Sequence, residues 1–272
     1  MPGTEVKIFK VSDSGDGKNV ECPRAKDIFN PKEDEQGEIC YRGRHIMTGY
    51  MANPDLGKDH LDKIQGKLDE AIDKEGWLHS GDKGCMGING MVKITGRYKH
   101  LLIGAGGENV APIPIENAVK KFCPAISNCM MIGDKQPFMA ALVTLKAVGA
   151  TGNEPGGDDL DEEALGVDSS VKKISEAVKS EKFKKYLVDC VVKANKEAAP
   201  NNASTIKKIC ILPRDFSVAT GELTPTLKLK RGVAVKKNQA SVDAIYSAPK
   251  NMAVVPYVGE DPSPTESSKE SE

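Results

Sequence analysis

Alternation of apolar and polar residues predicts β structure at the start of the chain. Val6 and Ile8, and later Ile39 and Tyr41, are separated by polar neighbours, as in strands that bury one face. Glycines between and beyond these pairs indicate turns. We therefore expect the first fifty residues to be β-rich.

A helix and a hairpin are predicted next. Asn53-Pro54 can cap and open a helix, because proline is tolerated in the first helical turn, and Gly76 is expected to end it. The apolar residues of this helix recur at spacings of three and four: Leu61, Ile64, Leu68, Ala71 and Ile72. Apolar segments at 85–88 and 91–94 then flank Asn89-Gly90. This dipeptide favours a type I′ turn, in which both central residues have positive φ.

Strand and helix patterns alternate in the second half of the chain. The apolar segments predict strands at 101–103, 129–132, 139–145 and 206–212, and helices near 112–122, 181–198 and 231–246. Four residues of the helix at 181–198 are expected to face inward: Leu187, Val188, Val191 and Val192. Residues 149–170 are rich in glycine and acidic residues, which favours an exposed loop.

These patterns predict an α/β (α+β) fold in two parts. A β-rich segment is expected over 1–96 and a smaller α/β domain over 101–250, with residues 97–100 between them. Residues 251–272 are polar and acidic and are expected to form a disordered tail.

The composition is that of an ordinary soluble globular protein, with 39% hydrophobic and 28% charged residues. A formal charge of −1 argues against a nucleic-acid binder, which normally has a clustered basic excess. No apolar run approaches the ~20 residues that span a bilayer, and the start lacks the apolar core of a signal peptide. The seven cysteines are scattered and include no Cys-x-x-Cys pair, so neither zinc binding nor a disulfide framework is expected. We predict a reduced, cytoplasmic protein and leave peripheral membrane contact and oligomeric state open.

Three polar residues near the predicted boundary are candidates for binding chemistry. Asp82 follows Gly81 on an expected turn, and its two acceptor oxygens suit the paired hydroxyls of a ribose; Gly-Asp is also a very common turn dipeptide. Arg97 lies across the predicted hairpin, where its guanidinium could complement ribose oxygens or a phosphate, or form a surface ion pair. Lys99 stands where two domains would reorient, or is an exposed linker lysine.

A glycine loop and a lysine-rich segment supply two more candidates. Gly104-Ala105-Gly106-Gly107 would let backbone amides approach a ligand closely, although a flexible turn would have the same sequence. It is not a triphosphate loop, because no Gly-Lys-Ser/Thr follows. In Leu223–Arg231 leucines and cations alternate, so Lys228 and Lys230 are expected on one side of an extended segment. Such a lysine could stabilise charge on a phosphate, or could discourage aggregation of an edge strand.

The remaining polar residues give weaker signals. The four histidines (His45, His60, His79 and His100) show no metal-ligand spacing, and no Ser/His/Asp set can be nominated. The lysine pairs at 120–121, 207–208 and 236–237 are expected to be solvated, with contact to the phosphates of coenzyme A as the alternative.

Five segments carry a family resemblance through their order and spacing. They are Gly-Glu-Ile-Cys-Tyr-Arg-Gly-Arg-His-Ile-Met-Thr-Gly-Tyr (37–50), Gly-Trp-Leu-His-Ser-Gly-Asp (76–82), Gly-Arg-Tyr-Lys (96–99), Gly-Gly-Glu-Asn-Val-Ala-Pro-Ile-Pro-Ile-Glu (106–116) and Leu-Thr-Pro-Thr-Leu-Lys-Leu-Lys-Arg (223–231). Together they resemble the adenylate-forming superfamily of acyl-CoA synthetases, with the greatest likeness to its bubblegum-type long-chain fatty acyl-CoA synthetases. The resemblance covers residues 1 to about 247.

The resemblance implies a two-step ligase. ATP and a fatty acid would form an acyl-adenylate with loss of pyrophosphate, and the thiolate of coenzyme A would then displace AMP. Asp82 matches the ribose-binding aspartate of this family, and Arg97 matches an arginine of the same nucleotide site. Lys99 matches the hinge about which the small domain rotates, and Lys228 matches the lysine of the adenylation step. Gly106, Gly107 and Glu108 resemble the segment that lines the pantetheine path.

The resemblance also implies what lies elsewhere. Residues 1–96 would be the last β-rich part of the large AMP-binding domain, and the helix around 55–73 looks like a surface insertion. The phosphate loop, the adenine and Mg²⁺ contacts and most of the acyl tunnel would lie upstream of Met1. We therefore expect the C-terminal part of a longer ligase that is inactive alone. A non-catalytic nucleotide- or coenzyme A-binding regulatory module, or a related adenylating enzyme with a different acid or acceptor, stays open.

Overall fold

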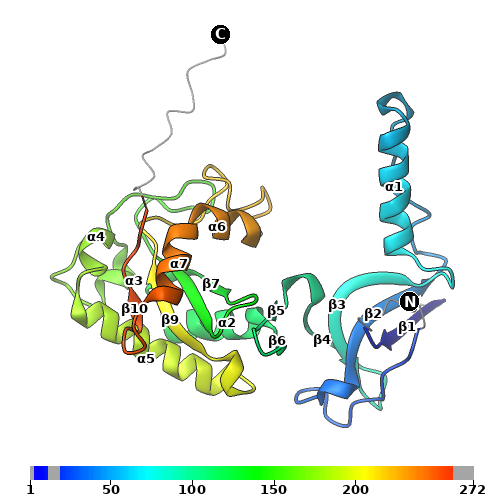
Figure 1. Ribbon diagram of the computed structural model, residues 1–272, viewed down its shortest axis with the longest axis horizontal. Helices are drawn as coiled ribbons and strands as arrows, with labels where there is room; N and C mark the ends of the chain where they lie inside the picture. The colour runs from blue at the N-terminus through cyan, green and yellow to red at the C-terminus, as the bar shows by residue number, and fades with distance from the viewer. Residues whose placement is uncertain (1–2, 12–18, 260–272) are drawn as a thin grey trace. The chain divides into compact units, whose positions relative to one another are not determined.

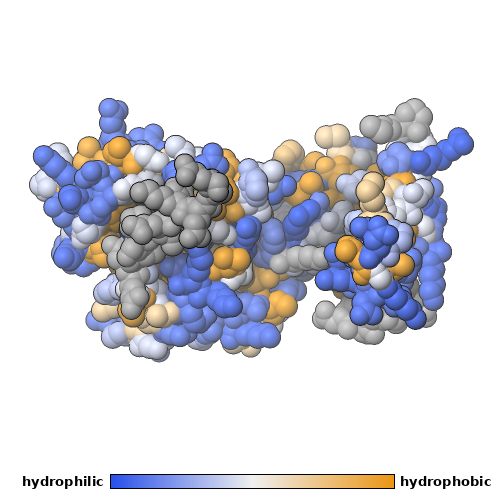
Figure 2. Space-filling view, turned by 90° about the horizontal axis from the view of Figure 1, so that it is seen from above, coloured by the Kyte–Doolittle hydropathy of each residue, from blue (hydrophilic) through white to orange (hydrophobic). Residues whose placement is uncertain are grey.

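The computed structural model describes residues 3–11 and 19–259, and packing divides the chain into two units, Met1–Leu101 and Leu102–Glu272 (Figure 1). Both units combine helices with β-sheet, so the predicted α/β fold class is confirmed. Hydrophilic residues are widely interspersed with hydrophobic ones on the face shown in Figure 2.

The first unit is built on a four-stranded antiparallel sheet in chain order. Its strands are β1 (Thr4–Phe9), β2 (Gln36–Gly43), β3 (Leu78–Met86) and β4 (Val92–Arg97). The alternation in the sequence produces one buried face, where Ile8 lies opposite Ile39 and both pack with Cys22 and Met86. The β prediction for the first fifty residues is confirmed.

The hairpin predicted at Asn89-Gly90 joins β3 to β4, but its turn type is different. Gly90 has φ +79°, whereas Asn89 does not have positive φ. Hydrogen bonds run from the Gly90 amide to the Gly87 carbonyl (2.9 Å) and from the Gly87 amide to the Met91 carbonyl (2.8 Å). The type I′ prediction is therefore wrong, because only one residue adopts the left-handed conformation that this turn requires twice.

The predicted helix after Asn53 is broken near its start. The Asn53 side chain caps only a 3₁₀ turn, η2 (Pro54–Leu56), and Gly57 then has φ +81°. The α-helix itself, α1 (Lys58–Ala71), ends before Gly76 and contains no buried residue. Leu61 is 38% exposed, and Ile64, Leu68 and Ala71 are only half-buried, so the described part of the chain covers the predicted apolar stripe incompletely. Figure 1 shows α1 standing away from the sheet of its own unit.

The second unit has a mixed four-stranded sheet with helices on both faces (Figure 1). Its strands, in the spatial order β10-β9-β8-β7, are β7 (Ile126–Ile132), β8 (Met139–Leu145), β9 (Ile206–Ile211) and β10 (Val254–Val255). Helices α2 (Pro112–Phe122) and α5 (Glu181–Ala198) pack on one face, and α6 (Arg231–Lys237) and α7 (Gln239–Ser247) on the other.

Strand β8 is covered by helices on both of its faces. All seven of its residues are buried. Met139, Ala141 and Val143 join the core beneath α2 and α5, while Ala140 and Leu142 join the core beneath α7. Successive side chains of a strand point to opposite faces, so a strand covered on both sides needs a largely apolar run, which in β8 only Thr144 interrupts.

Short elements complete the two units. They are the strands β5 (Leu102–Ile103) and β6 (Asn109–Val110), the helices α3 (Glu162–Leu165) and α4 (Ile174–Ala177), and the 3₁₀ turns η1 (Glu33–Glu35), η3 (Tyr98–His100) and η4 (Asn202–Ser204). In the part of the chain that the structure describes, no helix is both long and apolar enough to cross a bilayer.

Several sequence expectations for the second unit need correction. Val192 is 59% exposed, because only part of the apolar stripe of α5 reaches the core. The segment 149–170 is not simply an exposed loop, since α3 lies within it and Leu160 is buried. The single helix expected near 231–246 is two helices separated at Asn238. Val255 is buried in β10, so the tail does not begin at 251; residues 260–272 lie outside the described residues.

Candidate functional site

Asp82 and Arg97 face each other across the β3–β4 hairpin. They are direct Cα partners in the strand register. The Arg97 Nε donates to Asp82 Oδ1 over 2.6 Å, and the side chains are 50% and 26% exposed. An exposed ion pair of this kind contributes only about 0–1 kcal/mol to stability. Because both side chains are partly exposed, the pair is available for contact with a ligand.

A bulge in β3 places the Asp82 side chain. Between the pairs Cys40–His79 and Glu38–Lys83, three residues of β3 oppose one residue of β2. Gly81 takes the left-handed region at φ +73°, and Ser80 Oγ donates to the Ile39 carbonyl (2.6 Å) while accepting from the Asp82 amide (3.1 Å). Bulges re-aim a side chain away from the regular ladder. The predicted tight turn before Asp82 is therefore wrong, because Gly81 and Asp82 lie at a bulge within strand β3.

The polar groups of this pair have spare hydrogen-bonding capacity. An arginine has five donors and an ionised aspartate has two acceptor oxygens. Among the described residues, only the Nε–Oδ1 hydrogen bond joins Arg97 to a partner. The carboxylate can accept hydrogen bonds from two vicinal hydroxyls, and the guanidinium beside it can bind an anionic oxygen. This combination suits a nucleotide.

The predicted hinge lies in η3, directly after β4. Lys99 is the central residue of Tyr98–His100, and its side chain lies outside the described part of the structure. The division between the two units follows two residues later, after Leu101. The role of Lys99 as a hinge remains a prediction.

The glycine loop connects β5 to β6 in the second unit. The Gly104 amide donates to the Glu108 carbonyl (3.0 Å), and the Gly107 amide donates to the Gly104 carbonyl (2.9 Å). Gly107 has φ +85°, and a Cβ added to Gly106 would lie 2.6 Å from the Glu108 carboxylate. The Glu108 side chain therefore lies against the loop, and the positive φ of Gly107 is the feature that favours glycine here.

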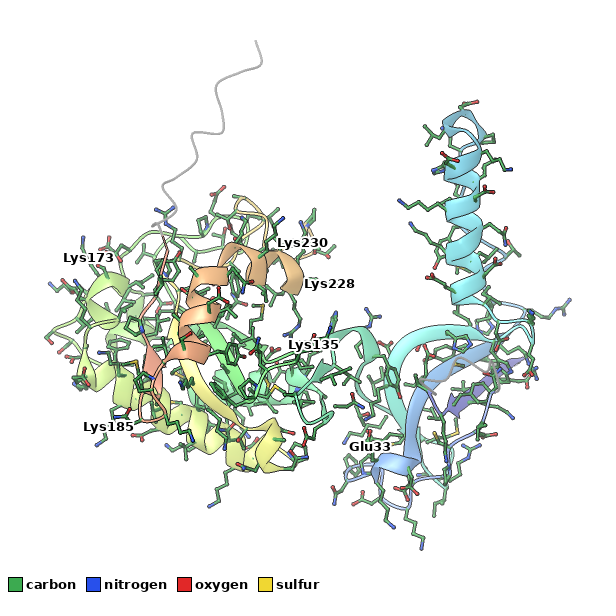
Figure 3. All side chains as sticks on the ribbon, in the orientation of Figure 1. Glu33, Lys135, Lys173, Lys185, Lys228 and Lys230 are labelled. Carbon is green, nitrogen blue, oxygen red and sulfur yellow. The ribbon has the colours of Figure 1, made fainter. Side chains whose placement is uncertain are left out.

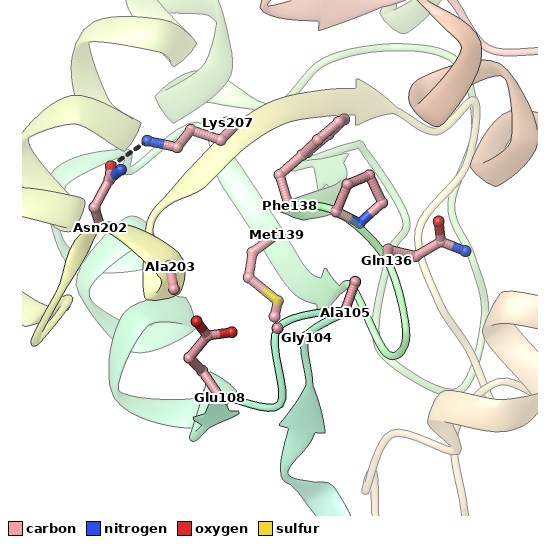
Figure 4. A pocket seen from close by; sticks show the side chains of 11 residues that line it. Gly104, Ala105, Glu108, Gln136, Phe138, Met139, Asn202, Ala203 and Lys207 are labelled. Atoms are coloured by element: carbon pink, nitrogen blue, oxygen red, sulfur yellow. Dashed lines mark hydrogen bonds between the residues drawn. The ribbon is translucent and has the colours of Figure 1, made fainter.

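A cavity of about 140 Å³ opens beside this loop (Figure 4). Gly104, Gly106 and Glu108 line one side, and Phe138 and Met139 contribute apolar surface. Lys207 also lines it, with its Nζ donating to Asn202 Oδ1 at 2.6 Å. An exposed backbone loop, an apolar wall and a cation together suit a thin ligand with an anionic end.

The lysine pair 207–208 does not form one solvated face. Lys207 is exposed, but Lys208 is only 5% exposed. Its Nζ donates to the Ile245 (3.1 Å) and Ala248 (2.6 Å) carbonyls near the C-terminus of α7. Cations stabilise the last turn of a helix by satisfying its free carbonyls. The expectation of a solvated pair is therefore wrong for Lys208.

Lys228 lies in a tight loop and not in an extended segment. Leu223 and Leu229 form an isolated antiparallel bridge, and the Thr224 amide donates to the Lys228 carbonyl (2.9 Å). Leu227 has φ +58° and is 52% exposed. The expected alternation is wrong because this turn reverses the chain. Lys228 is exposed (Figure 3), and its ammonium group has no hydrogen-bond or ion-pair partner among the described residues.

A buried ion pair anchors the end of this loop. Arg231 donates through Nη1 and Nη2 to the two carboxylate oxygens of Glu116 at 2.8 and 2.5 Å, and the Met131 amide also donates to Glu116 (2.6 Å). The side chains of Arg231 and Glu116 are 19% and 8% exposed. Sequence reasoning missed this pair, although each residue ends one of the quoted motifs.

The candidate residues thus form two groups. Asp82 and Arg97 meet in the first unit, while the Gly106–Glu108 loop and Lys228 belong to the second. Within the second unit, Glu116 follows the glycine loop on α2 and Arg231 follows Lys228 on α6. Their ion pair therefore links the two candidate loops.

Comparisons with known proteins show what this chain is similar to. Residues 99–156 match the AMP-binding enzyme C-terminal domain family. The chain is 44% identical over 225 residues to a long-chain-fatty-acid–CoA ligase ACSBG2 of Gallus gallus, a match that covers 81% of this chain and 28% of the relative. It is 40% identical over 240 residues to the ligase ACSBG1 of Homo sapiens, covering 86% of this chain and 31% of the relative.

Solved structures show the same fold. The adenylation domain of a carboxylic acid reductase from Segniliparus rugosus, in complex with AMP and a co-purified carboxylic acid, superimposes with a TM-score of 0.63 at 19% identity, over 90% of this chain and 32% of that one. The corresponding domain from Mycobacterium chelonae also gives 0.63 at 20% identity, over 91% and 32%.

These matches confirm the predicted resemblance. Over more than 80% of its length, the chain is similar to bubblegum-type long-chain-fatty-acid–CoA ligases. It spans less than one third of the length of the ligases quoted above.

Proposed function

We propose that this chain supplies the C-terminal part of an ATP-dependent long-chain fatty acid–CoA ligase. In the first step a fatty acid carboxylate oxygen attacks the α-phosphorus of ATP, and pyrophosphate leaves. In the second step the coenzyme A thiolate attacks the acyl carbonyl carbon, and AMP leaves with the electrons of the broken C–O bond. The chain's similarity to curated ligases supports this activity.

The cross-strand Asp82–Arg97 pair is the observation that carries the proposal. Its carboxylate accepts from the ribose hydroxyls of the nucleotide, and its guanidinium binds an oxygen of the same ligand. The two groups are already paired and accessible, so binding a nucleotide requires little reorganisation of the protein. Pre-positioned polar groups cost less to bring to a ligand than mobile ones.

The second unit supplies one group for each half-reaction. Lys228, on its exposed loop, neutralises charge that develops on the α-phosphate during adenylation. The Gly106–Glu108 loop lines the route of the pantetheine arm, and the cavity beside it gives that route apolar surface and a cation. Alternate use of these two groups requires rotation about Lys99. Mg²⁺, which the reaction uses with ATP, would be held by residues outside this set.

A hybrid enzyme tests the proposal. The matching C-terminal part of the Gallus gallus ligase would be replaced by this chain, and palmitate-dependent pyrophosphate release would be measured separately from thioester formation on supplied palmitoyl-adenylate. Lys228→Ala is expected to lower adenylation by about 10²–10³-fold, the usual loss when a donor to a developing charge is removed, and largely to spare thioesterification. Lys230→Ala is the matched control, since Lys230 is exposed two residues away.

The outcomes separate the alternatives. Equal loss of both half-reactions in Lys228→Ala contradicts the assigned role of the lysine. A folded hybrid that performs neither half-reaction favours a non-catalytic module. Activity with other acids but not with palmitate favours a related adenylating enzyme with a different substrate.

A further inference from the structure

Three metal-ligating side chains meet on β2 and β3 of the first unit. His79 Nδ1 lies 2.8 Å from Glu38 Oε2 and 3.5 Å from Cys40 Sγ. One ligand atom from each residue lies within 4.8 Å of the other two. Cys40 and His79 are Cα partners in the strand register, and Glu38 lies two residues before Cys40 on the same strand. Thiolate, imidazole and carboxylate are the ligand types that Zn²⁺ takes in proteins.

The spacing of these atoms is close to that of a tetrahedral site. With Zn–S of about 2.3 Å and Zn–N of about 2.0 Å, a tetrahedral S···N separation is about 3.5 Å, which equals the separation between Cys40 Sγ and His79 Nδ1. The corresponding N···O separation is about 3.3 Å, so the Glu38 oxygen would withdraw by roughly 0.5 Å. Cys40 is fully buried, whereas the His79 and Glu38 side chains are 27% and 15% exposed. An ion could enter from the side of these two residues.

The other nitrogen of His79 faces a carboxylate. His79 Nε2 lies 3.3 Å from Asp73 Oδ2. Asp73 is itself held in place, since Oδ1 accepts from the Glu75 and Trp77 amides (both 2.9 Å) and Oδ2 accepts from Asn19 Nδ2 (2.6 Å). A carboxylate on the far nitrogen of a histidine fixes its tautomer and leaves the near nitrogen free to bind a metal. This second group distinguishes the cluster from a chance meeting of polar residues.

We propose that Glu38, Cys40 and His79 bind a Zn²⁺ ion, with Asp73 orienting the histidine and the fourth coordination position open to water. Binding releases the thiol proton of Cys40 and the imidazolium proton of His79 to solvent. Without the metal, the same atoms hold an imidazolium between two carboxylates. The inference does not depend on the proposed ligase function, since it uses none of the residues assigned to it.

The site is nevertheless coupled to the bulge that carries Asp82. The second oxygen of Glu38, Oε1, accepts from the Gly81 amide at 2.7 Å. A metal that moves the Glu38 carboxylate therefore acts on the bulge that places Asp82. The local spacing of cysteines and histidines does not indicate this site, because its ligands meet only through strand pairing.

Cobalt titration of the metal-free 272-residue chain tests the proposal. Co²⁺ is expected to bind at one ion per chain with the near-ultraviolet charge-transfer absorption of a cobalt–thiolate bond, and Zn²⁺ is expected to displace it. Cys40→Ser should abolish this absorption. Cys85→Ser is the matched control, since Cys85 is also fully buried in the same sheet, and it should leave the absorption intact. Asp73→Asn should keep the absorption but weaken the affinity by about 10–100-fold.

Two results would overturn the proposal. One is the absence of saturable Co²⁺ or Zn²⁺ binding by the wild-type chain, which would leave the imidazolium as the only state of the cluster. The other is a thiolate absorption that persists in Cys40→Ser. If that variant does not fold, Glu38→Gln replaces it, and an affinity unchanged by loss of this carboxylate would equally overturn the site.

Discussion

Removal of the Glu116 charge is expected to destabilise the second unit strongly. In Glu116→Gln, the Arg231 guanidinium keeps its charge but loses the carboxylate that balances it, while the side chain stays 19% exposed. Breaking a buried pair from one side typically costs 3–5 kcal/mol. Because Arg231 is not completely buried, we expect a loss of about 3 kcal/mol in the free energy of unfolding.

Urea unfolding followed by far-ultraviolet circular dichroism measures this loss. Among the residues that the structure describes, every α-helix except α1 lies in the second unit, so the signal reports mainly on that unit. The midpoint of thermal unfolding should fall by roughly 6–12 °C for a unit of this size. The fluorescence of Trp77, the single tryptophan, reports on the first unit in the same samples.

An exposed ion pair between α2 and α5 is the control. Lys121 Nζ lies 2.8 Å from Glu197 Oε1, but these side chains are 63% and 44% exposed. Glu197→Gln should therefore cost less than about 1 kcal/mol. The double variant Glu116→Leu/Arg231→Met should lose less than Glu116→Gln, because no uncompensated charge is left behind. If Glu116→Gln costs no more than Glu197→Gln, the buried pair does not anchor the loop.

Three further predictions concern other groups. Hydrogen bonds to Cys40 and Glu38 raise the pKa of His79 to about 11, so the folded state favours the charged imidazolium. The contribution of this charge to the free energy of unfolding is therefore complete below about pH 6.5 and declines as the pH rises towards 11. Urea unfolding of the metal-free chain at several pH values should show this decline in the wild type and a flatter profile in His79→Gln. Gly107→Ala should cost about 1–2 kcal/mol, because alanine is strained at φ +85°; the same unfolding assay checks this, and an unchanged midpoint would contradict it. Asp82→Asn in the hybrid enzyme should raise the KM for ATP in the adenylation assay, and an unaltered KM would refute ribose binding by Asp82.

The sequence predicts contacts best where they are local. The hairpin at Asn89-Gly90 places β3 beside β4, and a register shift between Lys83 and Gly84 then sets Asp82 opposite Arg97. The apolar run at 139–145 likewise predicts a buried strand, and β8 is buried along its whole length. Side-chain period suffices for β8, whereas the pairing of Asp82 with Arg97 also depends on the register shift.

Long-range contacts and the burial of a helix face could not be predicted from the sequence. Glu116 and Arg231 are 115 positions apart, and no pattern of local spacing indicates that they meet. The periodicity of α1 predicts a buried face, yet the helix contains no buried residue. Amphipathic spacing specifies a helix, but whether another surface covers its apolar side depends on tertiary packing.

Strand β10 has a practical consequence for shortening the protein. Its two residues run parallel to β9 alongside Ile209 and Cys210, and the Val258 amide and carbonyl both bond to Ser241 Oγ at 2.8 and 2.9 Å. Deleting the residues after 250 would uncover a row of free amides and carbonyls beside an apolar strand, which invites pairing between molecules. A purification tag or protease site should therefore be placed beyond Gly259, where it leaves the pairing of β10 with β9 intact.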